Sequence, residues 1–439
     1  MAYWWWGMEQ ESEIMRVNKP SSSSWVVKME HMLEDAVPSV EMARWKQHSI
    51  YRVPEFIKKL TNGSAYQPQF VSLGPLHHGE DNLRSMEEHK RRAVLHMVNR
   101  AGKPLGKFIA AIEEIADELE KAYDDLDDKW RGSNRSRFVE IMVTDGCFLL
   151  EVMMRGDEDY AVNDPVFSAR SIGIFWPALR NDMIALENQL PLIVLQRLLT
   201  VQRGTDQSAN TINSLVLSFL GRPLEDQMDN LGLHMLDVYH KSYCCGRPQW
   251  ERSENCEALM PCATELNMAG IEFKKSKTKS IHDIGFENGV LSMPLFETGD
   301  STEVKFLNLM AFEWLHPDAE CDVVSYIYFW DQLIDFERDV ALLRNEGVFA
   351  NMIGSDKKAV HMFNTLTKLT WPNKDNRLGY VQWKVNAHCR KRRNKWRASF
   401  VSTYLSNPWV FISLVAAVIL LVATLLQTLY TIVPFYTRA

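Results

Sequence analysis

Several histidines lie close together in the sequence and have the chemistry to bind a metal ion. His89 and His96 are seven residues apart, which places them on one face of a helix with Glu88 beside them, and His77 and His78 come shortly before. Zinc ligands usually occur at tighter spacing, as in the HExxH motif or a CxxC pair, and the chain contains neither pattern. We therefore expect no metal and no other cofactor, and we interpret these histidines as partners of the backbone around the preceding Gly-Pro turn.

The segment 102–108, GKPLGKF, is similar to a phosphate-binding loop but departs from it twice. It has three residues between the glycines instead of four, and Phe108 stands where a Ser or Thr would hold magnesium. Nucleophilic catalysis has no better support, because no GxSxG motif occurs and Cys147 lies in an apolar run where burial is expected. The sequence therefore predicts neither a phosphate loop nor a catalytic nucleophile.

Carboxylates cluster in residues 124–128 and 331–339. Such groups are usually solvated helix faces, and acid–base chemistry would need a burial that a sequence does not show. We therefore expect a protein that is not an enzyme. The alternative is a membrane-bound enzyme whose site is assembled from separate segments, around His77-His78 and Glu187-Asn188-Gln189.

Helical periodicity predicts the elements that position these residues. One helix is expected from Ser85, where Ser85 and Glu88 form a capping box, to Gly102. A second begins at Pro104, and its apolar face should pack in a core: Phe108, Ile112, Ile115, Leu119, Tyr123 and Leu126. Further helices are expected over residues 136–154, 302–315, 321–345 and 355–370.

The stretch from Ala178 to Val201 is apolar nearly all round, so it should be central. It nevertheless contains Glu187-Asn188-Gln189, followed by Pro191. Buried polar groups need partners, and a proline removes a helical hydrogen bond. We expect a kinked or broken helix whose polar side chains bond to nearby backbone.

The β signal is confined to one region. Residues 284–287 and 290–293 flank Asn288-Gly289, a strong signature of a tight hairpin, and residues 271–274 could add a third strand. Residues 203–260 are less regular and are interpreted as a variable insertion or a boundary. The expected fold is mainly α: a multi-helix globular body with a small β-hairpin and one C-terminal transmembrane helix.

Residues 409–433 carry no charge, and Gln427 is their one strongly polar side chain. At about 1.5 Å per residue the segment is ~37 Å long, enough to cross a hydrocarbon core of ~30 Å. Soluble helices are rarely apolar on every face. We therefore expect a tail-anchored, single-pass membrane protein with the lipid bilayer as a partner, and a short tail over residues 434–439 after Pro434 closes the helix.

Basic residues before the span set its expected orientation. Six lie in a basic juxtamembrane helix over residues 376–408, and only Arg438 follows the span: Arg390, Lys391, Arg392, Arg393, Lys395 and Arg397. The positive-inside rule then places the body in the cytosol, at the plasma membrane or the endoplasmic reticulum. The opposite topology stays open. A basic helix with Trp396 and Phe400 can also bind anionic lipid, and a plain topology signal is an equal interpretation.

The overall charge argues against a nucleic-acid partner. The net charge is −7, and residues 377–439 contain nine Lys/Arg and no Asp/Glu, so removing their +9 leaves −16 on residues 1–376. Nucleic-acid binding needs a basic face on the folded domain.

Seven cysteines without a CxxC pair favour a reducing compartment. Residues 1–45 are interpreted as a flexible leader. We do not expect a secretory signal there, because Trp4-Trp5-Trp6 is too short for the apolar core of one.

Several motifs occur together in a fixed order. They are Ile50-Tyr51-Arg52-Val53-Pro54, Val71-Ser72-Leu73-Gly74-Pro75-Leu76-His77-His78-Gly79, Met86-Glu87-Glu88-His89-Lys90, Asp145-Gly146-Cys147-Phe148, Leu186-Glu187-Asn188-Gln189-Leu190-Pro191, Ala263-Thr264-Glu265-Leu266, Phe286-Glu287-Asn288-Gly289-Val290-Leu291 and Ser406-Asn407-Pro408-Trp409. With the terminal helix, the chain resembles the plant family called domain of unknown function 247, or UPF0481, from about Ile50 to Val433. The resemblance implies a mostly helical plant protein with one membrane span and no assigned catalytic residue. Some family members in grasses lie at self-incompatibility loci, where they are thought to act in pollen recognition.

The leading hypothesis is therefore a membrane-anchored, non-enzymatic interaction or recognition protein, in signalling or in self-incompatibility. Its protein partner is unknown, and self-association stays open. The expected domains are the leader, a family domain over residues 46–375, the juxtamembrane helix, the anchor over residues 409–433, and the tail.

Overall fold

A computed structural model describes residues 24–35, 38–154, 160–168, 171–222, 228–246, 256–257, 259–371, 376–405 and 408–437. Residues 1–47 and 48–439 form two separate units. The first contains α1 (Ser24–Asp35) and α2 (Pro38–Trp45), and Trp4-Trp5-Trp6 lies outside the described residues. The second unit contains every other element and all of the motifs quoted above.

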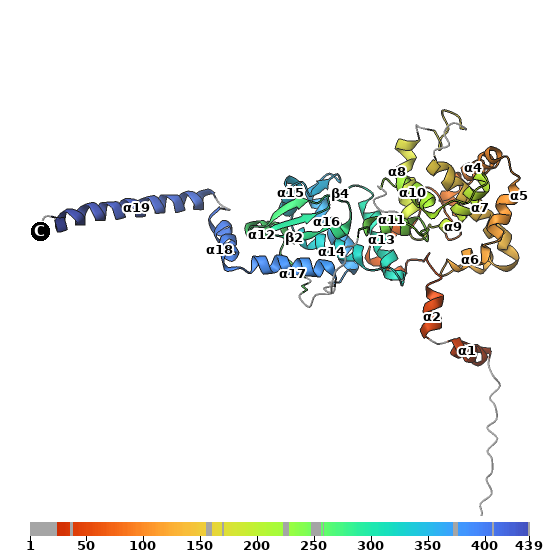
Figure 1. The fold of residues 1–439 in the computed structure, drawn as a ribbon, viewed down its shortest axis with the longest axis horizontal. Coiled ribbons are helices and arrows are strands. Elements are labelled where there is room, and N and C mark those ends of the chain that lie inside the picture. Colours follow the sequence, from red (N-terminus) through yellow and green to blue (C-terminus); the bar gives the residue numbers. More distant parts are fainter. Residues whose placement is uncertain are drawn as a thin grey trace, which may run out of the picture. The chain divides into compact units, whose positions relative to one another are not determined.

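Helices dominate the second unit (Figure 1). They are α3 (Glu55–Leu60), α4 (Ser85–Ala101), α5 (Leu105–Glu113), α6 (Ala116–Lys121), α7 (Arg135–Met154), α8 (Ile172–Ile184), α9 (Leu192–Arg203), α10 (Ala209–Phe219), α11 (Met235–Tyr243), α12 (Ala263–Met268), α13 (Thr302–Leu315), α14 (Asp322–Leu333), α15 (Glu337–Asn345), α16 (Asp356–Leu366), α17 (Arg377–Cys389), α18 (Arg392–Phe400) and α19 (Pro408–Thr437). The short strands are β1 (Glu272–Lys275), β2 (Gly285–Glu287), β3 (Val290–Met293), β4 (Phe296–Thr298) and β5 (Phe349–Asn351). The expected mainly α fold with a small β region is confirmed.

The predicted hairpin is present. β2 and β3 pair antiparallel through a turn in which Asn288 and Gly289 have φ values of 52° and 85°, the left-handed backbone that such a tight turn requires. β1 adds the expected third strand, parallel to β3. A second, parallel pair of β4 and β5 was not predicted, because each strand has three residues and carries too little alternation to read.

Buried apolar side chains form two clusters. The first lies among α4, α5, α7, α9 and α10, with Phe108, Phe138 and Phe148 fully buried. The second surrounds α13, α14, α16 and the sheets, where the ring of Phe296 stacks 5.4 Å from Phe306. α11 contributes to both: Val238 packs in the first and Tyr239 in the second. Residues 203–260, which read as irregular, thus contain a helix that joins the two cores.

Several predicted helix limits agree with the structure, and others are wrong. α4 begins at Ser85 and ends at Gly102, which has φ 59°. Its expected capping box is wrong: Arg84 occupies the cap position without a side-chain bond, because a preceding turn over Asp81–Leu83 leads directly into the helix. The helix expected from Pro104 is broken into α5 and α6, although its apolar face is buried as predicted.

The helix expected over residues 321–345 is also broken, into α14 and α15. Asp339 is the cause, because its fully buried carboxylate accepts the backbone N–H groups of Phe336 and Thr264, each at 2.9 Å. This residue belongs to a carboxylate cluster that the sequence led us to regard as solvated, so that expectation is wrong for Asp339. The carboxylates over residues 124–128 are exposed, as expected.

α19 is one helix of 30 residues, and residues 408–430 have the length and composition to cross a membrane. None of its most apolar window is buried, so its side chains do not pack in either core. The helix continues past Pro434 to Thr437, so the expectation that Pro434 closes it is wrong. A proline removes one hydrogen bond but allows the chain to stay helical when the neighbouring bonds persist. The juxtamembrane segment is two helices, α17 and α18, that meet at Arg390 and Lys391.

Candidate functional site

The segment over residues 69–74, which leads into the Val71–Gly79 motif, is held by side chains from other parts of the chain and not by a sheet. The Asp182 carboxylate accepts the N–H groups of Gln69, Phe70 and Val71 at 2.7–2.8 Å. The Asn188 side chain accepts from Leu73 at 2.7 Å and donates back to the Val71 and Asp182 carbonyls. The N–H groups of Gln69, Phe70, Val71 and Leu73 are thus paired with buried side chains, as burial of a backbone requires.

Gly74 ends this segment, at a point where three segments of the chain lie close together. Its φ is 72°, and a Cβ there would lie 2.7 Å from the Tyr123 hydroxyl and 2.8 Å from the Gln189 carbonyl. Its N–H donates to Asp145 Oδ2 at 2.7 Å. Only glycine satisfies both the left-handed backbone and the missing space.

Lys90 carries a buried positive charge next to this glycine. Its ammonium is completely inaccessible and lies 2.8 Å from Asp145 Oδ1, 2.7 Å from Glu87 Oε1 and 3.0 Å from Ser72 Oγ. Burial raises the pKa of Asp145, and the bonds from Lys90 and Gly74 oppose this without reversing it. Burial also opposes ionisation of Glu87, but Lys90 holds the pKa of Glu87 below its ordinary value. Three donor positions thus meet three acceptors, which is the arrangement a buried charge needs.

Glu187 organises a second buried network. It accepts the Val53 N–H at 2.6 Å, pairs with Lys58 Nζ at 2.9 Å, and lies 3.4 Å from His77 Nε2 without good hydrogen-bond alignment. His77 Nδ1 contacts Glu80 at 2.7 Å. Burial lowers the pKa of His77, but the two carboxylates outweigh it and raise that pKa overall. Burial raises the pKa of Glu187, but the nearby His77 and Lys58 outweigh it and leave that pKa lower than usual.

The structure therefore brings two predicted motifs together, His77 with Glu187. As expected, α8 and α9 are separated by a break, and the polar side chains in it bond to backbone. Gln189 donates to the Met183 and Ala185 carbonyls and accepts from Leu236 N–H on α11. These residues fasten the two cores to each other.

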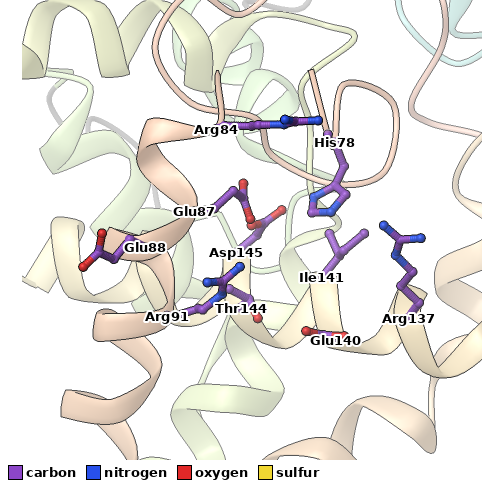
Figure 2. A pocket seen from close by; sticks show the side chains of 11 residues that line it. His78, Arg84, Glu87, Glu88, Arg91, Arg137, Glu140, Ile141, Thr144 and Asp145 are labelled. Atoms are coloured by element: carbon purple, nitrogen blue, oxygen red, sulfur yellow. The ribbon is translucent and has the colours of Figure 1, made fainter. Parts of the chain in front are cut away.

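A cavity of about 480 Å³ opens beside the Lys90 network (Figure 2). It lies between the loop that carries His78, α4 and α7, and it is lined by His78, Gly79, Arg84, Glu87, Glu88, Arg91, Arg137, Glu140, Ile141, Thr144 and Asp145. Glu187, Asn188 and Gln189 do not line it, so the pocket unites only part of the site expected for the alternative enzyme. Its walls carry three arginines and four carboxylates.

His78 is the least satisfied group in this pocket. Its Nδ1 is buried without a hydrogen-bond partner among the described residues, and its ring lies edge-on to Trp130 at 5.7 Å. Burial lowers the pKa of His78, so the ring is neutral at pH 7. A neutral imidazole between arginines and carboxylates can accept or donate one hydrogen bond to a bound group.

The histidines considered for metal binding do not converge among the described residues. His89 contacts Arg92 at 3.0 Å, and His96 packs against Tyr160. Two other groups place ligand atoms within 4.8 Å of one another: His240, Cys244 and Glu313, and Cys244, His282 and Asp322. Neither group was predicted from the sequence, because the members of each are far apart along the chain.

The first of these groups is occupied by protein contacts. Glu313 accepts the N–H groups of Val323 and Val324 at 2.8 and 2.9 Å, which caps α14. Its Oε1 also lies 2.6 Å from His240 Nε2, a hydrogen-bond distance too short to be spanned by a metal ion. This cluster is therefore a buried hydrogen-bonded unit.

The fold and these motif contacts define a class: a mainly helical body with two cores, locked by buried polar side chains and followed by a long apolar helix. The family described as a plant protein of unknown function, DUF247, matches residues 50–423, and the chain belongs to it. The resemblance inferred from the motifs is confirmed.

Two curated relatives from Arabidopsis thaliana match over most of their length. The UPF0481 protein At3g47200 is 27% identical over 440 residues, covering 92% of this chain and 90% of that protein. The putative UPF0481 protein At3g02645 is 21% identical over 509 residues, covering 92% and 93%. No solved structure matches this chain.

Proposed function

We propose that this chain is a membrane-anchored, non-enzymatic interaction protein whose body recognises a partner protein. The observation that carries the proposal is the exposure of α19. In α7, a core helix that is less apolar than α19, 14 of 20 residues are buried, whereas none of the most apolar window of α19 is buried. Exposed apolar surface of this extent is unfavourable in water and favourable in a bilayer.

Charge supports an orientation for that anchor. Arg392, Arg393, Lys395 and Arg397 lie on α18, shortly before α19, and Trp396 on the same helix is 67% exposed. Positive residues flank the cytosolic side of membrane spans. We infer that the body is cytosolic and that α18 contacts anionic lipid.

The pocket beside His78 is our choice for the recognition site. Arg91, Glu88 and Glu140 are exposed at its wall and have no ion pair among the described residues. A cavity that offers both signs of charge suits a peptide segment that carries both, because complementary charge sets specificity more than affinity. Signalling and self-incompatibility recognition would both use such a site.

The anchor is tested by placing charge in α19. Leu420 and Leu421 are 68% and 61% exposed, and changing both to arginine costs about 5–7 kcal/mol of insertion free energy at the centre of a span. The Leu420→Arg/Leu421→Arg variant should move into the carbonate-soluble fraction. Leu95→Arg, at a leucine of α4 that is also 68% exposed, is the matched control and should stay in the membrane fraction. Equal extraction of both variants and the wild type would contradict the anchor.

The recognition site is tested by photo-crosslinking in plant cells. A photoreactive amino acid at Glu88 or Glu140 should give a discrete crosslinked band, and one at the exposed Lys357 of α16 should not. The band should disappear when Arg84, Arg91 and Arg137 are changed to glutamate. Identical products from all three positions would show that the pocket is not the contact surface.

A further inference from the structure

A second cavity, of about 370 Å³, lies at the other core, and we name it the lysine pocket. It is formed by the loop after β1, the end of α11, the start of α13 and the segment before β4. Its lining is Arg222, Tyr243, Lys275, Ser276, Lys277, Thr278, Lys279, Pro294, Leu295, Phe296, Glu297, Lys305, Phe306 and Tyr326. Neither the motifs nor the pocket beside His78 includes any of these residues.

Arg222 is held in position by the protein. Its Nε donates to Ser242 Oγ at 3.0 Å and its Nη2 donates to the Ser242 carbonyl at 2.6 Å. The guanidinium carbon lies 4.1 Å from the centroid of the Tyr243 ring, a close cation–π contact. Within the described part of the chain, these two bonds use two of its five N–H groups, so the guanidinium is fixed but can still donate.

The loop that carries the lysines is fixed as well. The Asp283 carboxylate accepts the N–H of Thr278 at 3.1 Å and its hydroxyl at 2.9 Å. Ser280 Oγ lies 2.5 Å from the Cys245 carbonyl and 3.3 Å from the Tyr243 carbonyl, which ties the loop to the end of α11. This loop carries Lys275, Lys277 and Lys279, which alternate with Ser276 and Thr278. The contacts of Thr278 and Ser280 therefore order the backbone from which the three lysine side chains project.

No carboxylate of the described residues forms an ion pair with the positive side chains of this pocket. Among the described residues, no carboxylate lies within the 4.0 Å of an ion pair from Arg222, Lys305 or the three loop lysines. Glu297 is the acidic residue of the lining, and it is exposed. Five cations face one carboxylate in a chain whose net charge is −7.

The positive charge of the pocket lowers the pKa of Tyr243, which lies at its floor. Tyr243 is buried, and its hydroxyl lies 3.3 Å from that of Tyr239. Burial raises the pKa of Tyr243, but Lys305 and Arg222 outweigh it and leave that pKa below its ordinary value. Phe296, Phe306 and Tyr326, also buried, give the pocket an apolar wall.

We propose that the lysine pocket binds a small ligand that carries several phosphate groups on a compact ring, either free or as the headgroup of a lipid. Five cations around one cavity suit a ligand with several phosphate groups better than a ligand with a single carboxylate group. Each phosphate accepts hydrogen bonds from more than one donor. The cavity lies at the lower end of the size range of ligand pockets, which suits a headgroup and excludes a larger chain. This inference is independent of the function proposed above.

The test is a calorimetric titration of the full-length chain, in non-ionic detergent, with inositol hexakisphosphate. We expect saturable 1:1 binding that weakens as salt is added. Lys277→Glu/Lys279→Glu should weaken it about a hundredfold, since each lost phosphate contact corresponds to about tenfold. Lys357→Glu/Lys358→Glu, at two exposed lysines of α16, makes the same change of net charge away from the pocket and should leave the affinity within about twofold.

A second variant separates the pocket from a general attraction to surface lysines. Lys305→Met keeps most of the side-chain volume but removes the charge beside Tyr243, and it should weaken binding about tenfold. Its circular dichroism should match that of the wild type. No binding by the wild type, or equal weakening by the two glutamate pairs, would overturn the proposal.

Two further ligands identify the source of the phosphates. Inorganic phosphate should bind far more weakly than the hexakisphosphate, because it engages only part of the cation set. A phosphoinositide with short acyl chains should bind more tightly than its own free headgroup if the natural ligand is a lipid, and equally if it is a soluble phosphate; either result supports the site.

Discussion

Positive side chains have opposite environments at the two cores of the protein: one is buried and paired, and the others line an open pocket without a described ion-pair partner. Lys90 is completely buried, and Asp145, Glu87 and Ser72 surround its ammonium at hydrogen-bond distance. Lys275, Lys277 and Lys279 of the lysine pocket are exposed, Lys305 is half-buried, and no described carboxylate pairs with any of the four. A buried charge must be compensated within the fold, whereas an accessible one can await a ligand. The buried motif residues around Lys90 therefore stabilise the structure, and a ligand should be sought where accessible charge has no partner among the described residues.

The largest expected effect is at Lys90. Lys90→Ala leaves the buried Asp145 carboxylate and the half-buried Glu87 carboxylate without their cation, which should lower the free energy of unfolding by about 3–5 kcal/mol. Urea denaturation followed by tryptophan fluorescence measures this. Lys357→Ala, at an exposed lysine, should stay within about 0.5 kcal/mol of the wild type. A similar small effect at Lys90 would break the comparison.

A smaller loss is expected at Asn188. Asn188→Ala removes the acceptor for the Leu73 N–H and the donor for the Val71 carbonyl, both deep in the protein. Unpaired buried groups of this kind cost about 1–3 kcal/mol. The same denaturation experiment measures the loss, and hydrogen exchange should show faster exchange at Leu73. Unchanged protection at Leu73 would mean that the segment is held by other contacts.

The His77–Glu187 contact should make stability depend on pH. The pKa of His77 is raised, so its contribution is complete below the unfolded value of 6.5 and disappears as pH rises through the folded pKa. The pKa of Glu187 is lowered, so its contribution is present above 4.5 and is lost as pH falls through the folded pKa. The stability difference between wild type and His77→Gln should therefore be largest between about pH 4.5 and 6.5. A difference that grows above pH 7 would refute this account of the pair.

The smallest effect on unfolding is expected in the lysine pocket. Lys277→Ala/Lys279→Ala removes charges that have no ion-pair partner in the described part of the chain. Without ligand it should therefore change the free energy of unfolding by less than about 0.5 kcal/mol, or raise it slightly by relieving repulsion. A clear destabilisation would show that these lysines have a structural role and would remove the contrast with Lys90.

The sequence predicted the elements better than the contacts. Helical spacing located α4, α7 and α13, and Asn288-Gly289 located the hairpin, because those signals are local. The breaks between α5 and α6 and between α14 and α15 were missed. The second break depends on Asp339 accepting an N–H from Thr264, a residue 75 positions away.

The sites were harder to predict for the same reason. The pairing of His77 with Glu187 was anticipated only as a neighbourhood, and the partners of Lys90 come from three separate segments. The lysine pocket was not anticipated. Its cations lie at positions 222, 275–279 and 305, which are far apart in the sequence. A sequence does not show whether such lysines are separate surface residues or line one cavity.

One measurement tests most directly the central claim that the lysine pocket holds charge in reserve for a ligand. The free energy of unfolding should be measured for the wild type and for Lys277→Ala/Lys279→Ala, each with and without inositol hexakisphosphate at about a hundredfold excess over the wild-type dissociation constant. The account predicts a gain of about 2.7 kcal/mol in the wild type and a much smaller gain in the variant. Equal gains in both chains, or no gain in either, would contradict it.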